Sequence, residues 1–252
     1  MRAASVQDDV VVAVEAAQAA AEVLLALRRQ GGDDLRARGD GEAQRTIAEL
    51  LRARRPGDAV LSEEAPDDPA RLTADRVWIV DPLDGTREYG ESGRSDWAVH
   101  VALWERGELT AGAVALPARD LVLRSDDPPV LAAPHPGRPR LAVSRTRATE
   151  TVRALARALD AELVPLGSAG VKAMSVALGD VDAYVHTGGQ YEWDSAAPVA
   201  VARAAGLHTS RTSGDPLVYN RPDPLLPDLV VCRPELAGDV LAGLARLGTE
   251  VL

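Results

Sequence analysis

The stretch that decides the fold covers residues 78–86 and reads Trp78-Ile79-Val80-Asp81-Pro82-Leu83-Asp84-Gly85-Thr86. Its first three residues are apolar and favour β structure, which predicts a buried strand. Pro82 lacks the N–H group that a sheet ladder needs, so we expect the strand to end there. Two carboxylates, Asp81 and Asp84, therefore lie at the end of the strand, next to the backbone N–H groups of a small-residue turn.

Such a junction offers oxygen ligands for a hard divalent cation and N–H donors for an anion. The alternative is a simple turn, since Asp, Pro and Gly dominate turns. The acidic cluster Ser62-Glu63-Glu64 upstream favours a site that handles phosphate through metal. Haloacid-dehalogenase phosphatases do not fit, because they use Asp-x-Asp and the two acids here are three residues apart.

The composition is that of a folded, acidic protein. A chain of 252 residues suits one compact unit or two subdomains in close contact. Apolar residues make up 46% of it, which argues against disorder. The net charge of −10 disfavours a nucleic-acid polymer as partner, and it would repel an anionic substrate unless bound cations reverse the local sign. An acidic protein that binds phosphate therefore fits a metal-loaded site.

The sequence predicts a cytoplasmic protein without a membrane partner. We expect no apolar stretch of membrane-spanning length. Acidic residues interrupt the apolar N-terminal part, which argues against a signal peptide; they are Asp8, Asp9, Glu15 and Glu22. Cys232, the only cysteine, stands in an apolar run and is expected to be a buried, inert thiol.

The first half of the chain reads as a helix pair covering a largely antiparallel sheet. Apolar residues at helical spacing predict helices over residues 6–29 and about 42–54. Further strands are expected near residues 59–61, 97–104, 109–116 and 119–124. Asp40 precedes the second helix, where a helix cap is the simplest interpretation of its carboxylate.

Five prolines between residues 126 and 139 mark a surface connection, and we place a subdomain boundary there. The expected units are an N-terminal α+β subdomain, residues 1–131, and a C-terminal α/β subdomain, residues 132–252. Strands and helices alternate in the second unit, as in an α/β layer. We expect strands near 140–143, 162–166, 182–185 and 229–232, and helices near 149–159, 170–178, 194–205 and 235–247.

Two further stretches of the second half carry candidate site residues. Asp194 heads an Ala-rich helix, where it is either favoured by the helix dipole alone or leans into a cleft as a third Asp ligand. Gly167 and Ser168 precede another helix and present N–H groups, to which Lys172 adds a positive charge. The alternative there is an ordinary loop with a solvated lysine. The four histidines lack metal-ligand spacing, so core or surface roles are favoured for all of them.

Three motifs together resemble the inositol monophosphatase superfamily of metal-dependent, lithium-sensitive phosphatases. They are Ser62-Glu63-Glu64, the stretch 78–86, and Trp193-Asp194-Ser195-Ala196-Ala197. The continuation Gly85-Thr86-Arg87-Glu88-Tyr89 looks like the Gly-Thr-Lys-Glu-Phe of the 3'(2'),5'-bisphosphate nucleotidases, in particular the CysQ-type enzymes of actinobacteria. The resemblance implies an α/β fold of layers in the order αβαβα, an active site between the subdomains, and a homodimer.

The resemblance also implies a set of metal ligands for two or three Mg²⁺ ions. Glu63, Asp81, the carbonyl of Leu83 and the hydroxyl of Thr86 would hold the first ion. Asp81 would bridge to a second ion, which Asp84 and Asp194 would complete. A third, weakly held ion would contact Glu63 through water, and Li⁺ is an expected inhibitor.

The catalytic and substrate-binding residues follow from the same resemblance. Asp40 would accept a hydrogen bond from Thr86, so that the pair draws a proton from the attacking water, and Glu63 assists catalysis as well. Substrate contacts are expected from the N–H groups of Gly85 and Thr86 and from Ser168, Lys172 and Asp194.

The expected activity is Mg²⁺-dependent removal of the 3'-phosphate of adenosine 3',5'-bisphosphate (PAP) to give AMP, extending to its sulfated relative, in support of sulfate assimilation. The alternatives are an inositol-1-phosphate or fructose-1,6-bisphosphate phosphatase on the same scaffold and, more remotely, a catalytically silent nucleotide or metal sensor. Tyr191 and Gln190, beside Asp194, are candidates for contacting adenine, although Tyr191 could equally be an exposed loop aromatic.

Overall fold

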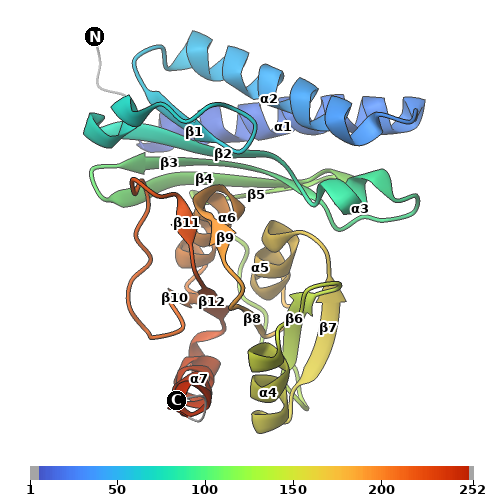
Figure 1. Cartoon of the computed structure of the whole chain (residues 1–252), viewed down its shortest axis with the longest axis vertical. Helices are drawn as coiled ribbons and strands as arrows, with labels where there is room; N and C mark the ends of the chain where they lie inside the picture. The colour runs from blue at the N-terminus through green and yellow to red at the C-terminus, as the bar shows by residue number, and fades with distance from the viewer. Residues whose placement is uncertain (1–5, 250–252) are drawn as a thin grey trace.

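A computed structural model describes residues 6–249, and these form five stacked layers (Figure 1). From one outer face to the other, the layers are a helix pair, a sheet, a second helix pair, a second sheet and a third helix pair. The first sheet has the order β1-β2-β3-β4-β5. Its strands are β1 (Ala59–Ser62), β2 (Arg76–Asp84), β3 (Ala98–Glu105), β4 (Glu108–Leu116) and β5 (Leu121–Arg124). The layered α/β architecture expected from the sequence is confirmed.

Helices α1 (Val6–Gln30) and α2 (Leu35–Arg54) cover the outer face of this sheet (Figure 1). The strands alternate strictly, because successive side chains point to opposite faces. In β2, Trp78 and Val80 pack against this helix pair, whereas Val77 and Ile79 pack into the middle of the molecule. The sheet is therefore buried on both faces, and only β1 runs parallel to its neighbour β2.

The expectation that no segment has membrane-spanning length is wrong for α1. Its Asp8–Gln30 portion is long and apolar enough to cross a membrane by length and composition. More than half of that portion is buried inside the protein, where its Val and Ala side chains pack against β3 and β4. The apolar character of α1 is thus explained by its place in the core.

The middle layer consists of α5 (Ala169–Ala177) and α6 (Glu192–Ala204), which lie between the two sheets (Figure 1). Helix α6 comes very close to β4, because a Cβ atom placed on Gly112 would lie 2.6 Å from the Cβ of Ala200. One buried cluster contains side chains of the first sheet, of both middle helices and of the second sheet. The two halves of the chain therefore share a core.

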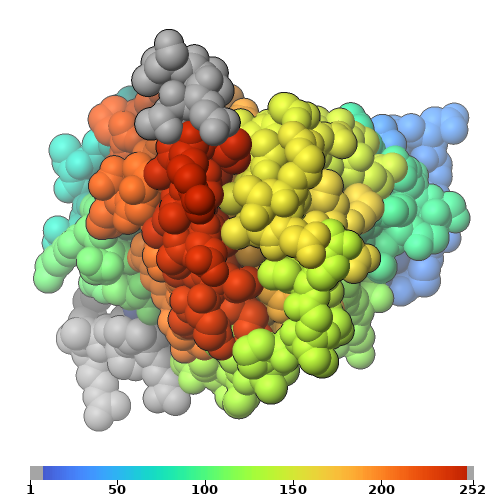
Figure 2. All heavy atoms as spheres, turned by 90° about the horizontal axis from the view of Figure 1, so that it is seen from below, coloured from blue at the N-terminus to red at the C-terminus, as the bar shows by residue number. Residues whose placement is uncertain are grey.

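The second sheet has the order β10-β12-β8-β6-β7. Its strands are β6 (Arg140–Ser144), β7 (Glu162–Leu166), β8 (Ala183–His186), β10 (His208–Ser210) and β12 (Leu229–Cys232). Helices α4 (Glu150–Ala158) and α7 (Ala237–Thr249) cover its outer face, and Figure 2 shows α7 in red running beside α4. Cys232 is buried among the apolar side chains of this layer, and burial raises the pKa of its thiol to about 12. The thiol is inert, as expected.

Short elements complete the fold. A two-stranded ribbon of β9 (Gln190–Tyr191) and β11 (Leu225–Leu226) leads into α6, and a single turn, α3 (Thr86–Gly90), follows β2. Three 3₁₀ turns lie at Pro69–Thr73, Pro117–Arg119 and Pro234–Leu236.

Two local expectations are wrong. The strand β2 does not end at Pro82 but continues to Asp84, because its register against β3 shifts between Asp81 and Asp84 and Pro82 is left without a ladder partner. Helix α2 begins at Leu35, so Asp40 lies within it and is not its cap. The helix passes through Gly39, where a Cβ atom would lie only 2.7 Å from the ring of Tyr89. This close packing on α3 is a tertiary contact that local sequence does not reveal.

Candidate active site

Four carboxylates from three separate elements line one cleft of about 550 Å³. Asp81 and Asp84 come from the carboxyl end of β2, and Glu63 directly follows β1. Because β1 and β2 are parallel, with Ser62 opposite Val80, their carboxyl ends meet at the same edge of the sheet. Asp194 is the third residue of α6 and completes the group from the middle layer.

These carboxylates influence one another strongly. Burial raises the pKa of Asp81 well above its usual range, and the charges of Asp84, Glu63 and Asp194 raise it further. The pKa of Asp194 rises to about 7 through burial and then the charge of Asp84. The pKa of Glu63 also rises to about 7, through desolvation in the cleft and then the charges of Asp194 and Asp84. Ionised carboxylates this close together repel one another, and a bound cation would offset that repulsion.

The donor atoms fit a hard divalent cation. One oxygen of Asp81, Oδ2, is buried and has no hydrogen-bond partner among the residues that the structure describes. Ligand atoms of Asp81, Asp84 and His100 all lie within 4.8 Å of one another. Carboxylate oxygens are the ligands that Mg²⁺ prefers, and neighbouring carboxylates commonly share such ions. The fold therefore gathers, at the end of β2, a group of side chains that could hold a metal ion.

The N-terminus of α5 holds Asp84 in place. Asp84 Oδ2 accepts hydrogen bonds from the hydroxyl of Ser168 and, at 2.7 Å, from the backbone N–H of Gly170. The Ser168 oxygen also accepts a bond of 2.9 Å from the N–H of Val171, so Ser168 caps the helix. The structure thus shows Ser168 orienting Asp84, and its expected contact with substrate stays a prediction.

Asp194 is placed for both of the roles that local sequence left as alternatives, and its role as a metal ligand stays a prediction. Its Oδ2 accepts a bond of 2.6 Å from the backbone N–H of Tyr191, which satisfies a free donor at the start of α6. The same carboxylate lines the cleft and raises the pKa of Asp81. Helix capping fixes the side chain that faces the other acids.

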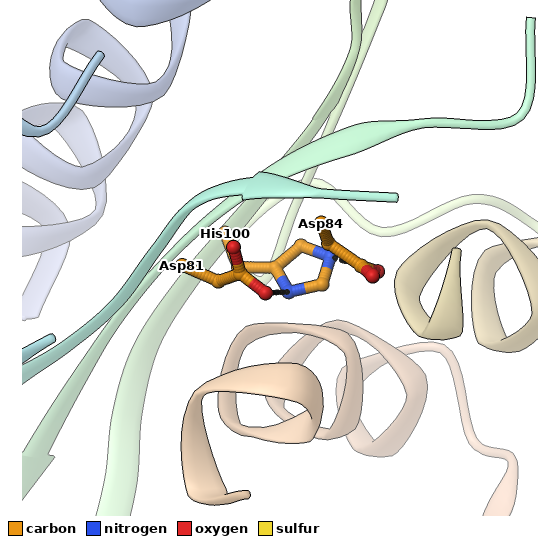
Figure 3. Close-up of side chains that lie close together, drawn as sticks. All are labelled: Asp81, Asp84 and His100. Atoms are coloured by element: carbon orange, nitrogen blue, oxygen red, sulfur yellow. Dashed lines mark ion pairs between the residues drawn. The ribbon is translucent and has the colours of Figure 1, made fainter. Parts of the chain in front are cut away.

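His100 is a site residue that the sequence analysis assigned only to core or surface. Figure 3 shows its fully buried ring between Asp81 and Asp84. Its Nε2 lies 3.3 Å from Asp84 Oδ2, and its Nδ1 lies 3.1 Å from the carbonyl oxygen of Trp193. Since a carbonyl only accepts, Nδ1 carries the proton, and the ring ties β3 to the start of α6 next to Asp194.

The His100 ring fits because the neighbouring residue of α5 is a glycine, Gly170. A Cβ atom on Gly170 would lie 1.9 Å from His100 Nε2, so only glycine fits there. The sequence shows only that His100 shares a strand face with the apolar residues Ala98 and Ala102; in the structure it stands directly opposite Asp81. That register becomes visible only once β2 and β3 are paired.

Asp40 and Thr86 meet as the sequence analysis expected. Thr86 Oγ1 lies 3.3 Å from Asp40 Oδ1 and 3.0 Å from the carbonyl oxygen of Leu83. Burial and then the charge of Glu64 raise the pKa of Asp40 to about 6, and the bond to Thr86 lowers it. This carboxyl is therefore poised to exchange a proton near neutral pH.

Gly85 makes the turn between β2 and α3 possible. Its φ of 86° is in the left-handed region, and a Cβ atom there would lie 3.2 Å from both the Asp96 carbonyl oxygen and the Ser168 side chain. Gly85 and Thr86 both line the cleft, at the first turn of α3.

Lys172 lines the cleft but is not the solvated lysine of the alternative reading. It is only 4% exposed, and its Nζ donates to the carbonyl oxygens of Gly167 and, at 2.9 Å, of Ser168. Burial lowers its pKa, and the charges of Asp84 and Asp194 oppose that change. Lys172 therefore stabilises the loop that carries Ser168, and its contact with a substrate anion stays a prediction.

Comparison with known proteins places this site in a family. The sequence matches the inositol monophosphatase family over residues 5–128 and 131–245. The chain belongs to the inositol monophosphatase family. A relative from Mycobacterium leprae, named 3'-phosphoadenosine 5'-phosphate phosphatase, is 51% identical over 254 residues, which cover 94% of this chain and 93% of the relative. Members of this metal-dependent family are phosphoric monoester hydrolases.

Solved structures agree with this assignment. CysQ from Bacteroides thetaiotaomicron superposes with a TM-score of 0.78 at 27% identity, covering 90% of this chain and 97% of that protein. An inositol monophosphatase from Anabaena superposes with a TM-score of 0.80 at 21% identity, covering 95% of this chain and 96% of its own. The second likeness concerns the fold alone.

The raised pKa values predict how stability depends on pH and metal. Glu63 and Asp194 titrate near pH 4 in the unfolded chain and near pH 7 in the folded, metal-free protein. Between these values the folded state binds more protons, so in EDTA the free energy of unfolding should fall as pH rises from about 4 to 7. Mg²⁺ at a hundred times its dissociation constant should restore about 2.7 kcal/mol, or ~5–10 °C in Tm.

Differential scanning fluorimetry at pH 5 and pH 8, with and without Mg²⁺, measures both effects. The gain in Tm from Mg²⁺ should be larger at pH 8, because the cation binds the ionised carboxylates. A gain that is equal at the two pH values would contradict the carboxylate cage.

Replacing His100 should weaken metal binding without unfolding the protein. We expect His100→Asn to raise the half-saturating Mg²⁺ concentration about tenfold or more, the usual cost of removing a group that orients a ligand. Calorimetric Mg²⁺ titration measures the affinity directly. His208→Asn is the matched control, since His208 bonds Ser210 on β10, outside the cleft. Equal Mg²⁺ affinities in the two variants would remove His100 from the site.

Proposed function

We propose that this protein is a Mg²⁺-dependent phosphomonoesterase that hydrolyses the 3'-phosphate of adenosine 3',5'-bisphosphate to give AMP, and that also accepts the sulfated relative of this nucleotide. The observation that carries the proposal is the group of four carboxylates in one cleft, which Thr86 also lines, with Asp40 behind Thr86 and hydrogen-bonded to its hydroxyl. The name of the M. leprae relative supports the choice of nucleotide. Removal of this product would serve sulfate assimilation.

The proposed metal ligands divide into two sets. Glu63, Asp81, the Leu83 carbonyl and the Thr86 hydroxyl would hold one ion, and Asp81, Asp84 and Asp194 a second. Magnesium ions bound there would neutralise phosphoryl oxygens and lower the pKa of a nearby water. Lithium is the expected inhibitor at the same ligands.

The residues of the chain would hold and orient the reacting groups. The N–H groups of Gly85 and Thr86 would bind the scissile phosphate at the turn where φ is positive. Thr86 would orient the attacking water through its hydroxyl, and Asp40, with its pKa near 6, would take up the proton through that hydroxyl. Water is the nucleophile, and no phosphoenzyme is required.

The adenine would lie against Tyr191. This side chain is 46% exposed at the rim of the cleft and stacks on Trp193, with the ring centroids 4.7 Å apart and the planes at 13°. A rigid, partly exposed aromatic face is suited to stacking a nucleobase. Gln190 also lines the cleft, and its buried amide has no hydrogen-bond partner among the described residues. Its donor and acceptor match the edge of adenine.

The substrate is tested by kcat/KM on the purified enzyme with adenosine 3',5'-bisphosphate, inositol 1-phosphate and fructose 1,6-bisphosphate, each with saturating Mg²⁺. We expect the adenosine bisphosphate to be preferred by at least about tenfold, because only this substrate stacks on Tyr191. Preference for inositol 1-phosphate would overturn the nucleotide assignment. Absence of Mg²⁺-dependent phosphate release with all three would favour a silent sensor.

Thr86→Ala tests the proposed path of the proton. We expect kcat to fall about a hundredfold while KM changes less than about threefold, because the hydroxyl acts on the attacking water and not on substrate binding. Thr86→Ser keeps the hydroxyl and should retain most of the activity. If Thr86→Ser is as impaired as Thr86→Ala, the methyl group and not the hydroxyl is what matters.

The compartment and assembly state complete the proposal. We expect a cytoplasmic enzyme that acts as a homodimer on a small phosphorylated molecule and binds neither membranes nor nucleic-acid polymers. Sedimentation of the purified chain measures the assembly state directly.

A further inference from the structure

Four cationic side chains line the cleft, and they differ in how far they are already engaged. They are Arg87, Arg145, Arg147 and Lys172. Lys172 donates to two backbone carbonyl groups and is buried. Arg145 is held by Glu88 at 2.8 Å and by Glu91 at 2.9 Å, so its charge is already paired. Both side chains are therefore already engaged by the protein, Lys172 through two of its three N–H donors and Arg145 through two carboxylates.

Arg147 is different. Its backbone N–H donates to the hydroxyl of Ser144 at 3.1 Å, which fixes the turn after β6. Its side chain is exposed and makes no hydrogen bond or ion pair with any residue in the described range 6–249. A guanidinium group that faces a cleft without a partner has all its N–H donors free for a ligand.

Arg147 lies in the part of the cleft that Ser144 and His186 also line. The same three residues line a small hollow next to the cleft, which places Arg147 beside His186. Arg147 and His186 both line the same cleft as Tyr191. Arg147 therefore lies on the wall that the second half of the chain contributes, beside the rim where the nucleobase is expected.

The expected substrate carries a second phosphate that a free guanidinium group could bind. The metal cage and the turn at Gly85 serve the phosphate that is hydrolysed, and a bisphosphate brings a second dianion of the same kind. In a protein with a net charge of −10, that second group needs a cation of its own. Guanidinium binds phosphate through two parallel N–H···O bonds, which gives strength and direction.

We propose that Arg147 binds the second phosphate of the substrate, the one that is not hydrolysed, and thereby selects bisphosphates over monophosphates. For adenosine 3',5'-bisphosphate this is the 5'-phosphate, and the inference rests on the proposed function. Arg87 is also exposed in the cleft, but it follows Thr86 directly and belongs to the turn that serves the scissile phosphate. Loss of Arg87 would lower kcat/KM for monophosphate and bisphosphate substrates alike.

The test compares two substrates that differ only in the second phosphate, adenosine 3',5'-bisphosphate and adenosine 3'-monophosphate. Arg147→Ala should lower kcat/KM for the bisphosphate roughly 10- to 100-fold, the usual worth of a hydrogen bond to a charged group. For the monophosphate, kcat/KM should fall by less than about threefold. For the bisphosphate, kcat/KM of Arg147→Lys should lie between those of wild type and Arg147→Ala, because lysine keeps the positive charge but cannot donate two parallel hydrogen bonds.

Arg153→Ala is the matched control. Arg153 is an exposed arginine of the following helix, α4, and does not line the cleft, so its removal changes the net charge equally. Arg153→Ala should leave kcat/KM unchanged for both substrates. A second readout needs no catalysis of the test ligand: AMP should inhibit the wild type more strongly than adenosine does, and Arg147→Ala should remove that difference.

The outcomes separate this inference from the proposed function. If the wild type prefers inositol 1-phosphate to both nucleotides, the proposed function fails. If the wild type prefers the bisphosphate but Arg147→Ala affects both nucleotides equally or neither, the assignment of Arg147 fails and the nucleotidase proposal stands. Selective loss of the bisphosphate in Arg87→Ala, with Arg147→Ala unaffected, would likewise overturn the assignment.

Discussion

Mutual repulsion among buried carboxylates is the constraint on which the rest of this structure depends. Asp81 is 1% exposed and Asp84 8% exposed, and both share their cleft with Glu63 and Asp194. Without cations these groups cannot all ionise, and their raised pKa values express that cost. The fold nevertheless holds them with dedicated partners, and a bound cation would offset this cost.

The middle layer is what makes the cage possible. Both of its helices direct their N-terminal ends at the acids, where free N–H groups and the positive end of the helix dipole favour negative charge. Helix α5 supplies the Gly170 N–H to Asp84, and Tyr191 supplies the N–H that holds Asp194. His100 joins the first sheet to the start of α6 from between the two ligands of β2. The Tyr191 contact is local, but the Gly170 N–H and His100 come from elements distant in the chain, so the site forms only when the first sheet and the middle helices are packed together.

This distribution explains which features the sequence could reveal. Asp81 and Asp84 were predictable because a buried strand and the turn after it are both local patterns, and the helices and strands of the core follow from their own periodicity. The course of β2 through Pro82 was not predictable, because it depends on a register shift against β3. The start of α2 was missed as well: the helix begins at Leu35, and its first turns pack against α3 through the close approach of Gly39 and Tyr89, a contact that local sequence does not show.

His100 and Arg147 escaped sequence analysis for complementary reasons. His100 has no motif, and its meaning comes from lying opposite Asp81 in the paired sheet. Arg147 is one of 28 basic residues, and only the ion pairs that engage its neighbour Arg145 show which of the two guanidinium groups is available to a ligand. A pattern can predict that a residue has a useful side chain, but whether that side chain is already engaged is a property of the fold.

The two halves of the chain therefore carry different parts of the chemistry. Under the proposed function, the first half contributes Glu63, Asp81, Asp84 and Thr86, which would act on any phosphate ester without distinguishing the alcohol. The second half contributes Asp194 and the wall with Tyr191 and Arg147, where substrates would be distinguished by stacking and by charge. Because the Asp194 carboxylate joins the acids of the first half and also bonds the backbone of Tyr191, a change in how α6 begins would move a proposed metal ligand together with Tyr191. Under this proposal, substrate preference and metal binding both depend on the geometry at the start of α6, because Asp194 and Tyr191 are joined there.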